Sequence, residues 1–593
     1  MCGLAGFVNL DGAPADHAVL SAMMRLVAHR GPDDRGTRMF SLRSHDAPDS
    51  AFGFHRLAIL DLSQQGHQPM ANADGSVILV YNGEVYNAFD HKPLLEAAGY
   101  RFRSRSDAEV LLYLYEHVGL DGMLERLNGM FALAIADLRH RQVHLVRDHF
   151  GIKPLYWTQV GESVLFASEA KAFLAHPAFT PEVAGAFVDE QLAFRYVAGD
   201  ATLMKGVKQL RPGHRLTIAG GGVATARYWS IPDVPAAPPT RAGEVDELHA
   251  LLQTSVRSQL VGDVPVGCQL SGGVDSSLVT AFARAEGAAQ NVFSVVFDDP
   301  KFSEAPWIEA AASITGAESH AGLFTAESFL DPLEDATWHM DQPISVPNSL
   351  GIWQLARHAR PYATVLLSGE GADEVFAGYS RFQNASQLTA DAFVLTTLFQ
   401  RPSKLARLRP ESNLPAVIER RAALFGEGQG DPLGRCVKYE MQTFLVDVLM
   451  RQDKMTMAHA VENRVPFLDR RVVEFARTLG AESLVGPGGA KAIVKAVARR
   501  FFSDGFVDRP KAAFNLPLSQ YFRSARFTAL MEDQVLPGIR QRSLVSEPAV
   551  RALWKRALAA PAVTEVFWIP VALELWAQQF LDGRRVRTPA TTA

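Results

Sequence analysis

The sequence predicts an α/β fold made of two successive parts. In the first part, short apolar stretches that read as strands alternate with two or three helical stretches. In the second part, the apolar runs 264–270 and 363–367 are typical of buried parallel strands, and helical patterns separate them. We therefore expect a layered sandwich, then a doubly wound parallel sheet, then a mostly helical part from about residue 411.

The chain length and one Pro/Ala-rich stretch predict where the two parts meet. A chain of 593 residues is too long for one hydrophobic core, and its 48% apolar content supplies enough material for two. The stretch 231–239 reads as an extended linker, and a helix should begin at about Ala242. We expect a first domain at 2–210, a linker at 211–240, a second domain at 241–580 and a tail at 581–593.

The N-terminus offers a candidate nucleophile. Removal of Met1 would leave Cys2 carrying both a thiol and a free α-amino group. A thiol is only weakly ionised at neutral pH, whereas an α-amine that titrates near pH 8 can accept its proton. The pattern is compatible with amide hydrolysis, although a cysteine at the second position also arises by chance.

Four polar segments follow Cys2, and each lies beside an apolar run. They are 29–33, 55–57, 82–87 and 106–109. The apolar run 77–81 reads as a buried strand that enters an Asn-Gly turn, which would leave polar groups exposed at its end. Such a set of charged and amide side chains can bind a small zwitterion.

With these segments, the first part of the chain resembles the glutamine amidotransferase domain of the N-terminal-nucleophile class. The resemblance implies an α/β/β/α sandwich in which Cys2 attacks the side-chain amide of glutamine, forms a γ-glutamyl thioester and releases ammonia. The residues that it places around the glutamine are Arg56, Asn82, Gly83, Glu84 and Asp107.

The implied roles suit these residue types. Arg56 would bind the glutamine α-carboxylate, because a guanidinium holds a carboxylate through two parallel hydrogen bonds. Glu84 and Asp107 would bind the α-ammonium. Asn82 and the Gly83 N–H would form the oxyanion hole, where preorganised donors stabilise the tetrahedral intermediate.

A glycine-rich loop opens the second part. The segment 271–277 stands between a predicted strand at 264–270 and a predicted helix at 278–283. Its glycines let backbone N–H groups approach an anion, and the helix adds the positive end of its dipole, so the loop should bind phosphate. It lacks the Gly-Lys-Ser/Thr ending of a P-loop and resembles the pyrophosphate loop of ATP pyrophosphatases. The expected ATP-binding residues are Leu270, Ser271, Gly272, Gly273, Asp275, Ser276, Val295, Ser368 and Gly369.

Acidic and basic side chains beside this loop predict a metal and a phosphate partner. Asp275 and Asp373 are the candidate Mg²⁺ ligands, because Mg²⁺ takes one or two carboxylates together with phosphate oxygens and water. Lys491 and Lys495 should share one face of a helix and present two positive charges.

Taken together, the motifs make nearly the whole chain resemble the glutamine-hydrolysing asparagine synthetase family. The resemblance implies that aspartate and ATP form β-aspartyl-AMP, that ammonia crosses an internal tunnel, and that the products are asparagine, AMP and pyrophosphate. Lys491 aligns with a lysine near the pyrophosphate, and Asp341 with the proposed general base. The aspartate site itself is not readable from residue types, and Gln342 stands where relatives often have an acid.

Two alternatives stay open at this point. One is an amide synthetase that uses the same chemistry on a different carboxylate. The other is an adenylate-forming enzyme or nucleotide-binding regulator with an inactive N-terminal scaffold, against which the presence of Cys2 argues.

The composition indicates the cellular compartment and argues against membrane and nucleic-acid partners. Three cysteines in such a long chain argue against a disulfide framework and for a reducing, cytoplasmic compartment. No apolar run is long enough to span a bilayer, so we expect no membrane contact. With a net charge of −5, the chain lacks the broad basic field that is expected of a nucleic-acid-binding protein. The family resemblance adds a possible homodimer.

Overall fold

The computed structural model describes most of the chain, and the account below concerns only those residues. They are 2–43, 47–236, 242–299, 301–383, 385–486, 489–510 and 516–583. Residues 237–240 of the expected linker and residues 584–593 of the expected tail therefore lie outside the described residues.

Two antiparallel six-stranded sheets build the N-terminal part. The first has the order β10-β8-β9-β1-β3-β2 and consists of β1 (Gly3–Asn9), β2 (Asp34–Phe40), β3 (Ser50–Arg56), β8 (Tyr156–Val160), β9 (Ser163–Ala167) and β10 (Lys208–Gln209). The second has the order β12-β11-β7-β6-β5-β4 and consists of β4 (Met70–Ala71), β5 (Val77–Val85), β6 (Gly129–Asp137), β7 (Gln142–Arg147), β11 (His214–Ala219) and β12 (Gly222–Arg227).

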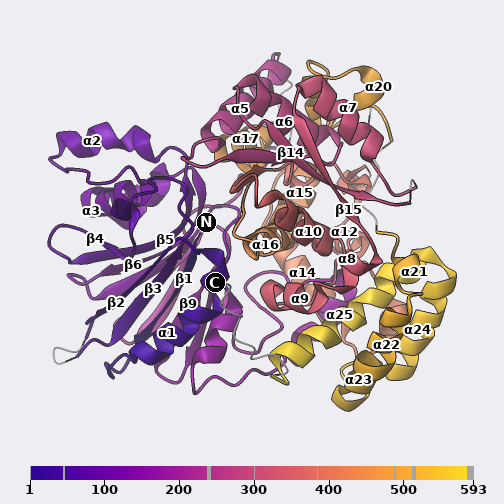
Figure 1. The fold of residues 1–593 in the computed structure, drawn as a ribbon, viewed down its shortest axis with the longest axis horizontal. Helices are drawn as coiled ribbons and strands as arrows, with labels where there is room; N and C mark the ends of the chain where they lie inside the picture. Colours follow the sequence, from indigo (N-terminus) through magenta and orange to yellow (C-terminus); the bar gives the residue numbers. More distant parts are fainter. Residues whose placement is uncertain are drawn as a thin grey trace.

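Helices cover the outer face of each sheet. Helix α1 (His17–Leu26) packs on β1 and β3, while α2 (Lys92–Ala97) and α3 (Asp107–Arg126) lie over the second sheet, where α3 contacts β5. A buried cluster that includes Phe52 and Val80 fills the space between the sheets. Figure 1 shows the resulting layers, and the expected α/β/β/α sandwich is confirmed.

Two local details differ from the sequence-based expectation. Asn82 and Gly83 do not form a turn, because β5 continues to Val85 and pairs with β6 along its whole length. Strands β11 and β12 lie within the expected linker and extend the second sheet by pairing with β7 and with each other. Long-range strand pairing has overridden the local Asn-Gly signal in the first case.

A five-stranded parallel sheet organises the second part. Its order is β15-β14-β13-β16-β17, and its strands are β13 (Val266–Gln269), β14 (Asn291–Phe297), β15 (Glu318–Phe324), β16 (Val365–Leu367) and β17 (Glu462–Arg464). All four pairings are parallel. The sequence predicted the strands at 264–270 and 363–367 but not β17, whose three residues are polar and yet buried.

The strand order shows that this sheet is doubly wound. Helices α6 (Val274–Ala285) and α7 (Ala305–Thr315) connect β13, β14 and β15 in one direction, and α10 (Ser349–Ala359) precedes the return to β16 on the other side of β13. Right-handed crossovers then place these helices on opposite faces. The reversal lies between β13 and β16, where open parallel sheets form their ligand crevice.

The remaining helices form most of the C-terminal region, and all of them except α4 lie in the second part of the chain. They are α4 (Val188–Phe194), α5 (Glu244–Gln259), α8 (Ala326–Leu330), α9 (Leu333–Met340), α11 (Ala372–Val375), α12 (Ala390–Thr396), α13 (Pro402–Leu408), α14 (Leu414–Phe425), α15 (Pro432–Gln442), α16 (Phe444–Met457), α17 (Arg470–Ala476), α18 (Ala481–Leu484), α19 (Ala492–Ala498), α20 (Asp504–Val507), α21 (Leu518–Tyr521), α22 (Ala525–Leu530), α23 (Leu536–Arg542), α24 (Glu547–Ala559) and α25 (Thr564–Phe580). Two short strands, β18 (Val485–Gly486) and β19 (Gly489–Ala490), pair with each other. Helices therefore dominate from α12 onward, earlier than expected, with β17 interrupting them.

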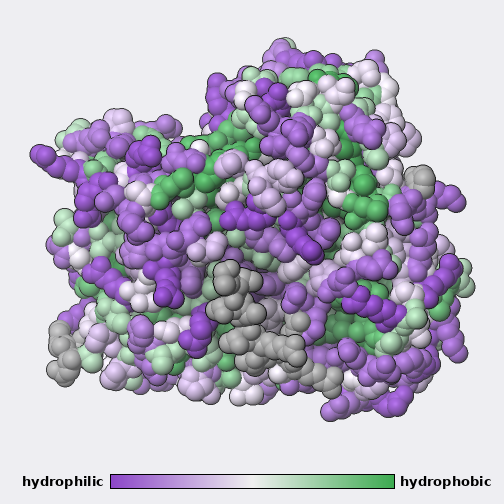
Figure 2. Space-filling view, viewed as in Figure 1, coloured by the Kyte–Doolittle hydropathy of each residue, from purple (hydrophilic) through white to green (hydrophobic). Residues whose placement is uncertain are grey.

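The two parts share a continuous core. One apolar cluster contains residues of the N-terminal sandwich, such as Phe7 and Phe173, and residues of the second part, such as Leu278 and Trp568. The face shown in Figure 2 is mostly hydrophilic, with smaller apolar patches. Among the helices that the structure describes, none has the length and apolar content needed to cross a bilayer.

Candidate functional site

Cys2 lies buried at the start of β1, beside β5 of the opposite sheet. Its backbone nitrogen donates a hydrogen bond to Asn82 Oδ1 at 2.8 Å, and its Sγ lies 3.9 Å from the carbonyl oxygen of Leu57. Burial raises the pKa of the Cys2 thiol. Removal of Met1 would turn this same nitrogen into the α-amine, so nucleophile, base and Asn82 already stand together.

Arg56 is held in place by the loop that follows β3. Its guanidinium donates to the carbonyl oxygens of Ser63 at 2.8 Å and Leu60 at 3.1 Å, and also to that of Asp61. Gly66 lies against it, and a Cβ there would come within 2.0 Å of the guanidinium. The side chain is thus fixed near Cys2, where its charge lowers the thiol pKa against the larger effect of burial.

Glu84, near the end of β5, and Asp107, at the start of α3, form a buried acidic pair. Asp107 accepts hydrogen bonds from the Tyr81 hydroxyl at 2.6 Å and from the Val85 backbone at 3.0 Å. Burial, and then the Asp107 carboxylate, raise the pKa of Glu84 well above its usual range. Among the described residues, Glu84 Oε1 has no hydrogen-bond partner, so this pair can receive a cationic group.

Gly83 is required by the close approach of β6. An added Cβ would lie 2.1 Å from the Met130 carbonyl oxygen and 2.7 Å from Phe131 Cα. The neighbouring Asn82 is fully buried, and its Nδ2 has no hydrogen-bond partner within the described part of the chain. A free, buried N–H donor beside Cys2 is what an oxyanion hole requires.

The glycine-rich loop joins β13 to α6 at the sheet reversal. Ser271 Oγ and Ser276 Oγ lie 3.0 Å apart, and Ser271 Oγ accepts from the Gly273 N–H at 3.3 Å. Gly272 has a φ of +74°, and Gly369, in the loop after β16, packs so closely that a Cβ would lie 2.7 Å from the Ser276 nitrogen. The two loops together frame the N-terminus of α6.

A cavity of about 700 Å³ opens over these loops. Its lining contains ten of the residues proposed from the sequence, namely Leu270, Ser271, Gly273, Asp275, Ser276, Val295, Ser368, Gly369, Asp373 and Lys491. Gly272 does not line the cavity; its carbonyl accepts a hydrogen bond from Arg509 at 2.5 Å. The cavity is large enough for a nucleotide and a second small substrate.

Lys491 joins the two candidate metal ligands. Its Nζ lies 2.5 Å from Asp275 Oδ2 and 2.8 Å from Asp373 Oδ1. Lys491 precedes α19 in a left-handed conformation, with φ 57°, so the expectation that it lies on the helix with Lys495 was wrong, although both line the cavity. Asp275 Oδ1 has no hydrogen-bond partner among the described residues, and two converging carboxylates match the oxygen donors that Mg²⁺ prefers.

Sequence reasoning missed several polar residues of the cavity. Arg451 and Gln452 line it from α16, and Glu304, Asn348 and Arg509 line it from other elements. Arg451 Nε pairs with Asp447 one turn earlier at 2.9 Å. The available signal was the charged residues inside 444–457, an otherwise apolar helical run.

Asp341 lies away from this cavity. It follows α9 in a left-handed conformation and is buried between Lys171, at 3.2 Å, and Lys454, at 3.5 Å. The indole N–H of Trp576 donates to its backbone oxygen at 3.0 Å. Two ammonium groups already neutralise this carboxylate, so its surroundings support an interface role and not that of the expected general base.

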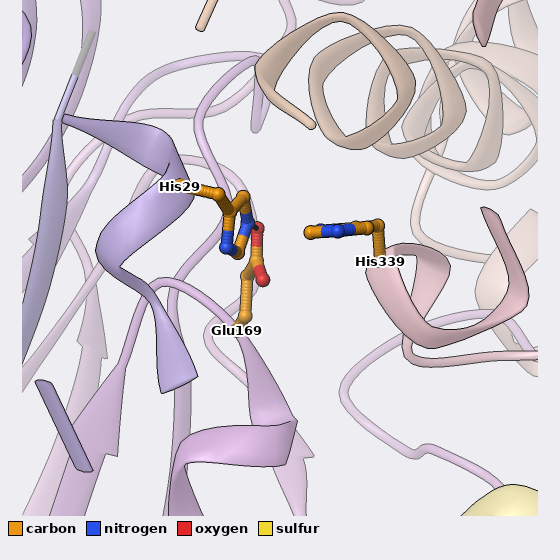
Figure 3. Close-up of side chains that lie close together, drawn as sticks. All are labelled: His29, Glu169 and His339. Atoms are coloured by element: carbon orange, nitrogen blue, oxygen red, sulfur yellow. Dashed lines mark hydrogen bonds and ion pairs between the residues drawn. The ribbon is translucent and has the colours of Figure 1, made fainter. Parts of the chain in front are cut away.

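His29, Glu169 and His339 meet where the two parts of the chain touch (Figure 3). His29 Nε2 lies 3.0 Å from Glu169 Oε1, and the His29 and His339 rings are 4.1 Å apart. Burial lowers the pKa of both histidines. The geometry resembles a metal site, but Glu169 also pairs with Arg30 at 2.8 Å and with Lys171, so its charge is already neutralised and the cluster does not fit a divalent cation.

Arg30 connects Cys2 to this interface. Its Nε donates to the Cys2 carbonyl at 3.1 Å, while its two terminal nitrogens bind Glu169 and, at 2.8 Å, Asp453 of α16. Burial alone would lower the pKa of Arg30, but Asp453 and Glu169 raise it above its usual range. The nucleophile strand is thereby tied to the helix that lines the cavity.

Comparison with protein families agrees with this division. The family described as asparagine synthase matches residues 247–578, and the family described as glutamine amidotransferase domain matches residues 1–229.

Individual relatives extend over both parts. Asparagine synthetase [glutamine-hydrolyzing] 1 from Bacillus subtilis is 29% identical and covers 88% of this chain and 88% of its own length. A putative asparagine synthetase [glutamine-hydrolyzing] from Mycobacterium tuberculosis is 31% identical and covers 88% of this chain and 89% of its own. A glutamine phosphoribosylpyrophosphate amidotransferase structure from B. subtilis is 19% identical with a TM-score of 0.30, and the match covers 51% of this chain and 68% of that one.

The ion-pair assignment of the Glu169 cluster leads to a stability prediction. Glu169→Gln should destabilise the protein by about 3–5 kcal/mol, because it removes the carboxylate that Arg30 and Lys171 share and leaves two buried cations with only Asp453 and Asp341 as their charged partners. Glu182→Gln, which breaks the exposed pair with Lys205, should change stability by about 1 kcal/mol or less. Thermal melting monitored by circular dichroism measures both, and a melting temperature that falls on dialysis against a chelator would instead support a structural metal at Glu169.

Proposed function

The chain belongs to the asparagine synthase family, and we propose that it is a glutamine-dependent asparagine synthetase. The observation that carries this proposal is the pairing of two sites in one chain: Cys2 with its buried amide, acidic and guanidinium partners, and the cavity over the loop 271–277. The first site suits hydrolysis of glutamine. The second suits activation of aspartate by ATP, with ammonia as the shared intermediate.

Glutamine hydrolysis uses groups that the structure places around Cys2. The thiol gives its proton to the α-amine while the sulfur attacks the side-chain carbonyl carbon of glutamine. The free N–H of Asn82 and the Gly83 N–H stabilise the oxyanion, and its collapse releases ammonia and leaves a thioester that water hydrolyses to glutamate. Arg56 binds the α-carboxylate, and Glu84 with Asp107 binds the α-ammonium.

Amide synthesis follows in the cavity. The ATP phosphates lie on the loop 271–277, and the β-carboxylate of aspartate attacks the α-phosphorus, so that pyrophosphate leaves. Ammonia then attacks the acyl carbon, and AMP departs to give asparagine. Lys491 stabilises the phosphate charge, and Asp275 and Asp373 would hold the Mg²⁺ ion, which neutralises charge on the pyrophosphate.

Three further features belong to the same proposal. The expected domain limits at 2–210 and 241–580 place one site in each part, and ammonia would cross the interface that Arg30 and Asp453 share. The free, buried state of all three cysteines supports a reducing, cytoplasmic location. A homodimer rests on the family resemblance alone, and light scattering of the purified protein tests it.

The decisive experiment measures all products together. The purified protein is incubated with ATP, Mg²⁺, glutamine and aspartate, and glutamate, AMP, pyrophosphate and asparagine are quantified by mass spectrometry. Equal amounts of AMP and asparagine support the proposal. Release of glutamate without aspartate-dependent formation of AMP would instead indicate that the acceptor is a different carboxylate.

Loss of the nucleophile should separate the two half-reactions. Cys2→Ala should lower glutamine-dependent synthesis by about a thousandfold or more, because no thioester can form. Synthesis from added ammonium chloride should be retained, since the cavity is unchanged. Cys436→Ala, which removes a buried cysteine of α15 in the second part of the chain, should retain both activities. Equal loss of both activities in Cys2→Ala would contradict the two-site assignment.

Loss of a candidate metal ligand should have the opposite effect. Asp275→Asn should lower aspartate-dependent AMP formation by about a hundredfold or more, because a charge that faces the phosphates is removed. Glutamate release from glutamine should continue. The control is Asp504→Asn, which changes an exposed aspartate paired with Arg499. Unchanged AMP formation in Asp275→Asn would show that Asp275 is not part of the phosphate site.

A further inference from the structure

Arg464 reaches from the parallel sheet into the glutamine site. It is fully buried on β17, and its NH2 nitrogen lies 3.3 Å from Glu84 Oε2. The rest of its guanidinium is fixed within its own part of the chain. Nε pairs with Glu462 at 2.6 Å, and NH1 donates to the carbonyl oxygens of Gln259 at 2.7 Å and Val261 at 2.5 Å. One nitrogen is thus left to cross the interface.

The backbone of Arg464 is fixed just as firmly. Its carbonyl oxygen accepts a hydrogen bond from the Ser368 N–H at 2.9 Å, and β17 pairs with β16 along its three residues. The neighbouring Asn463 donates to Ser368 Oγ at 3.2 Å. The backbone of Arg464 is therefore held by the end of β16, and Ser368, the proposed ATP-binding serine, directly follows this end of β16.

The ionised form of Glu84 is disfavoured by burial and by neighbouring acidic groups, so a nearby cation is required to stabilise it. The charged and titratable groups that act on it are Asp107 on α3, Glu462 and Arg464 on β17, the buried Tyr81 and Tyr86, and the N-terminal amine, which together with Arg464 lowers the pKa of Glu84. Within the described part of the chain, Arg464 is the one cationic side chain that forms an ion pair with Glu84. Its second oxygen, Oε1, keeps no hydrogen-bond partner and is available to a ligand.

We propose that Arg464 is a positioning residue for glutamine binding, which acts across the interface by orienting the Glu84 carboxylate toward the α-ammonium of glutamine. The proposal rests on the proposed glutaminase function. It adds that the glutamine pocket is complete only when the parallel sheet is docked against the sandwich. Asp107 does not need the same help, because the Tyr81 hydroxyl and two backbone N–H groups already orient it.

The direction of the pH dependence follows from the charges. Burial, Asp107 and Glu462 raise the pKa of Glu84, and Arg464 opposes them. Without Arg464 the pKa rises further, so Glu84 is protonated over more of the neutral range. A neutral carboxyl group binds the α-ammonium weakly, and binding should recover as rising pH removes the proton.

The experiment compares three variants of the full-length protein. Arg464→Lys keeps the charge but cannot reach Glu84, Glu462 and two carbonyls at once, whereas Arg464→Gln removes the charge. Arg470→Gln is the matched control, because Arg470 also crosses the interface, donating to the Glu125 carbonyl at 3.0 Å, but does not contact the glutamine residues. The KM and kcat for glutamine hydrolysis are measured between pH 6.5 and pH 8.5 (roughly the range in which a raised carboxyl pKa is visible), with ammonia-dependent asparagine synthesis as the check on folding.

We expect both Arg464 variants to raise the glutamine KM by about 10- to 100-fold at neutral pH, the cost of one charge-assisted contact. The increase should shrink as the pH rises, while ammonia-dependent synthesis and the Arg470→Gln control stay near wild type. The double variant Arg464→Lys/Glu84→Gln should bind glutamine no worse than Glu84→Gln alone, because both changes remove the same interaction.

Three results would overturn the proposal. They are an unchanged glutamine KM in Arg464→Lys, an increase that is additive with Glu84→Gln, and a loss of ammonia-dependent synthesis equal to the loss of glutamine use. The last would assign Arg464 a purely structural role. A wild-type protein that releases no glutamate would refute the proposed glutaminase itself, and this outcome is distinct from all three.

Discussion

The buried guanidinium of Arg30 is the interaction on which the arrangement of the two sites depends. It binds the Cys2 carbonyl, Glu169 of the sandwich and Asp453 of α16, and its side chain is fully buried. Burying such a charge is costly unless every donor finds a partner. The sandwich and the helical part can therefore dock in only one relative position. That position sets where Cys2 lies relative to the cavity.

The same physical rule explains why ion pairs cross the interface in addition to the shared apolar core. Lys171 pairs with Asp341 across it, and Arg464 pairs with Glu84 in the same way. Apolar contacts alone would tolerate small shifts, because the hydrophobic effect has no direction. Directional ion pairs do not tolerate such shifts. A route for ammonia between two active sites requires this kind of fixed alignment, since a displacement of either half would open the route to water.

The residues that sequence analysis identified have local signatures, whereas contacts between residues far apart in the sequence have none. Cys2 at the N-terminus and the glycine-rich loop 271–277 can be recognised from their neighbours alone; in the structure Cys2 contacts Asn82, and Gly273 lines the cavity while Gly272 does not. Arg464 and Glu84 are separated by 380 residues, so nothing near either one predicts their contact. The strand 462–464 was missed for the same reason, because its charged side chains are buried only through partners elsewhere. Asn82 and Gly83 show the opposite case. Their local sequence predicts a turn, but in the structure both residues pair with β6 as part of β5.

Burial of Cys2 has a consequence for the order of events in the glutamine site. Because burial raises the thiol pKa, the free site holds its nucleophile as the neutral thiol, which is a poor target for oxidants and stray electrophiles. Attack then requires a proton transfer to the adjacent amine at the moment when the carbonyl of glutamine is in place. The Cys2 nitrogen is held by Asn82 Oδ1, and among the described residues the Nδ2 of the same side chain has no hydrogen-bond partner. In the proposed mechanism a single buried amide would thus orient the base and stabilise the charge that the base helps to create, so that reactivity would appear only when substrate is bound.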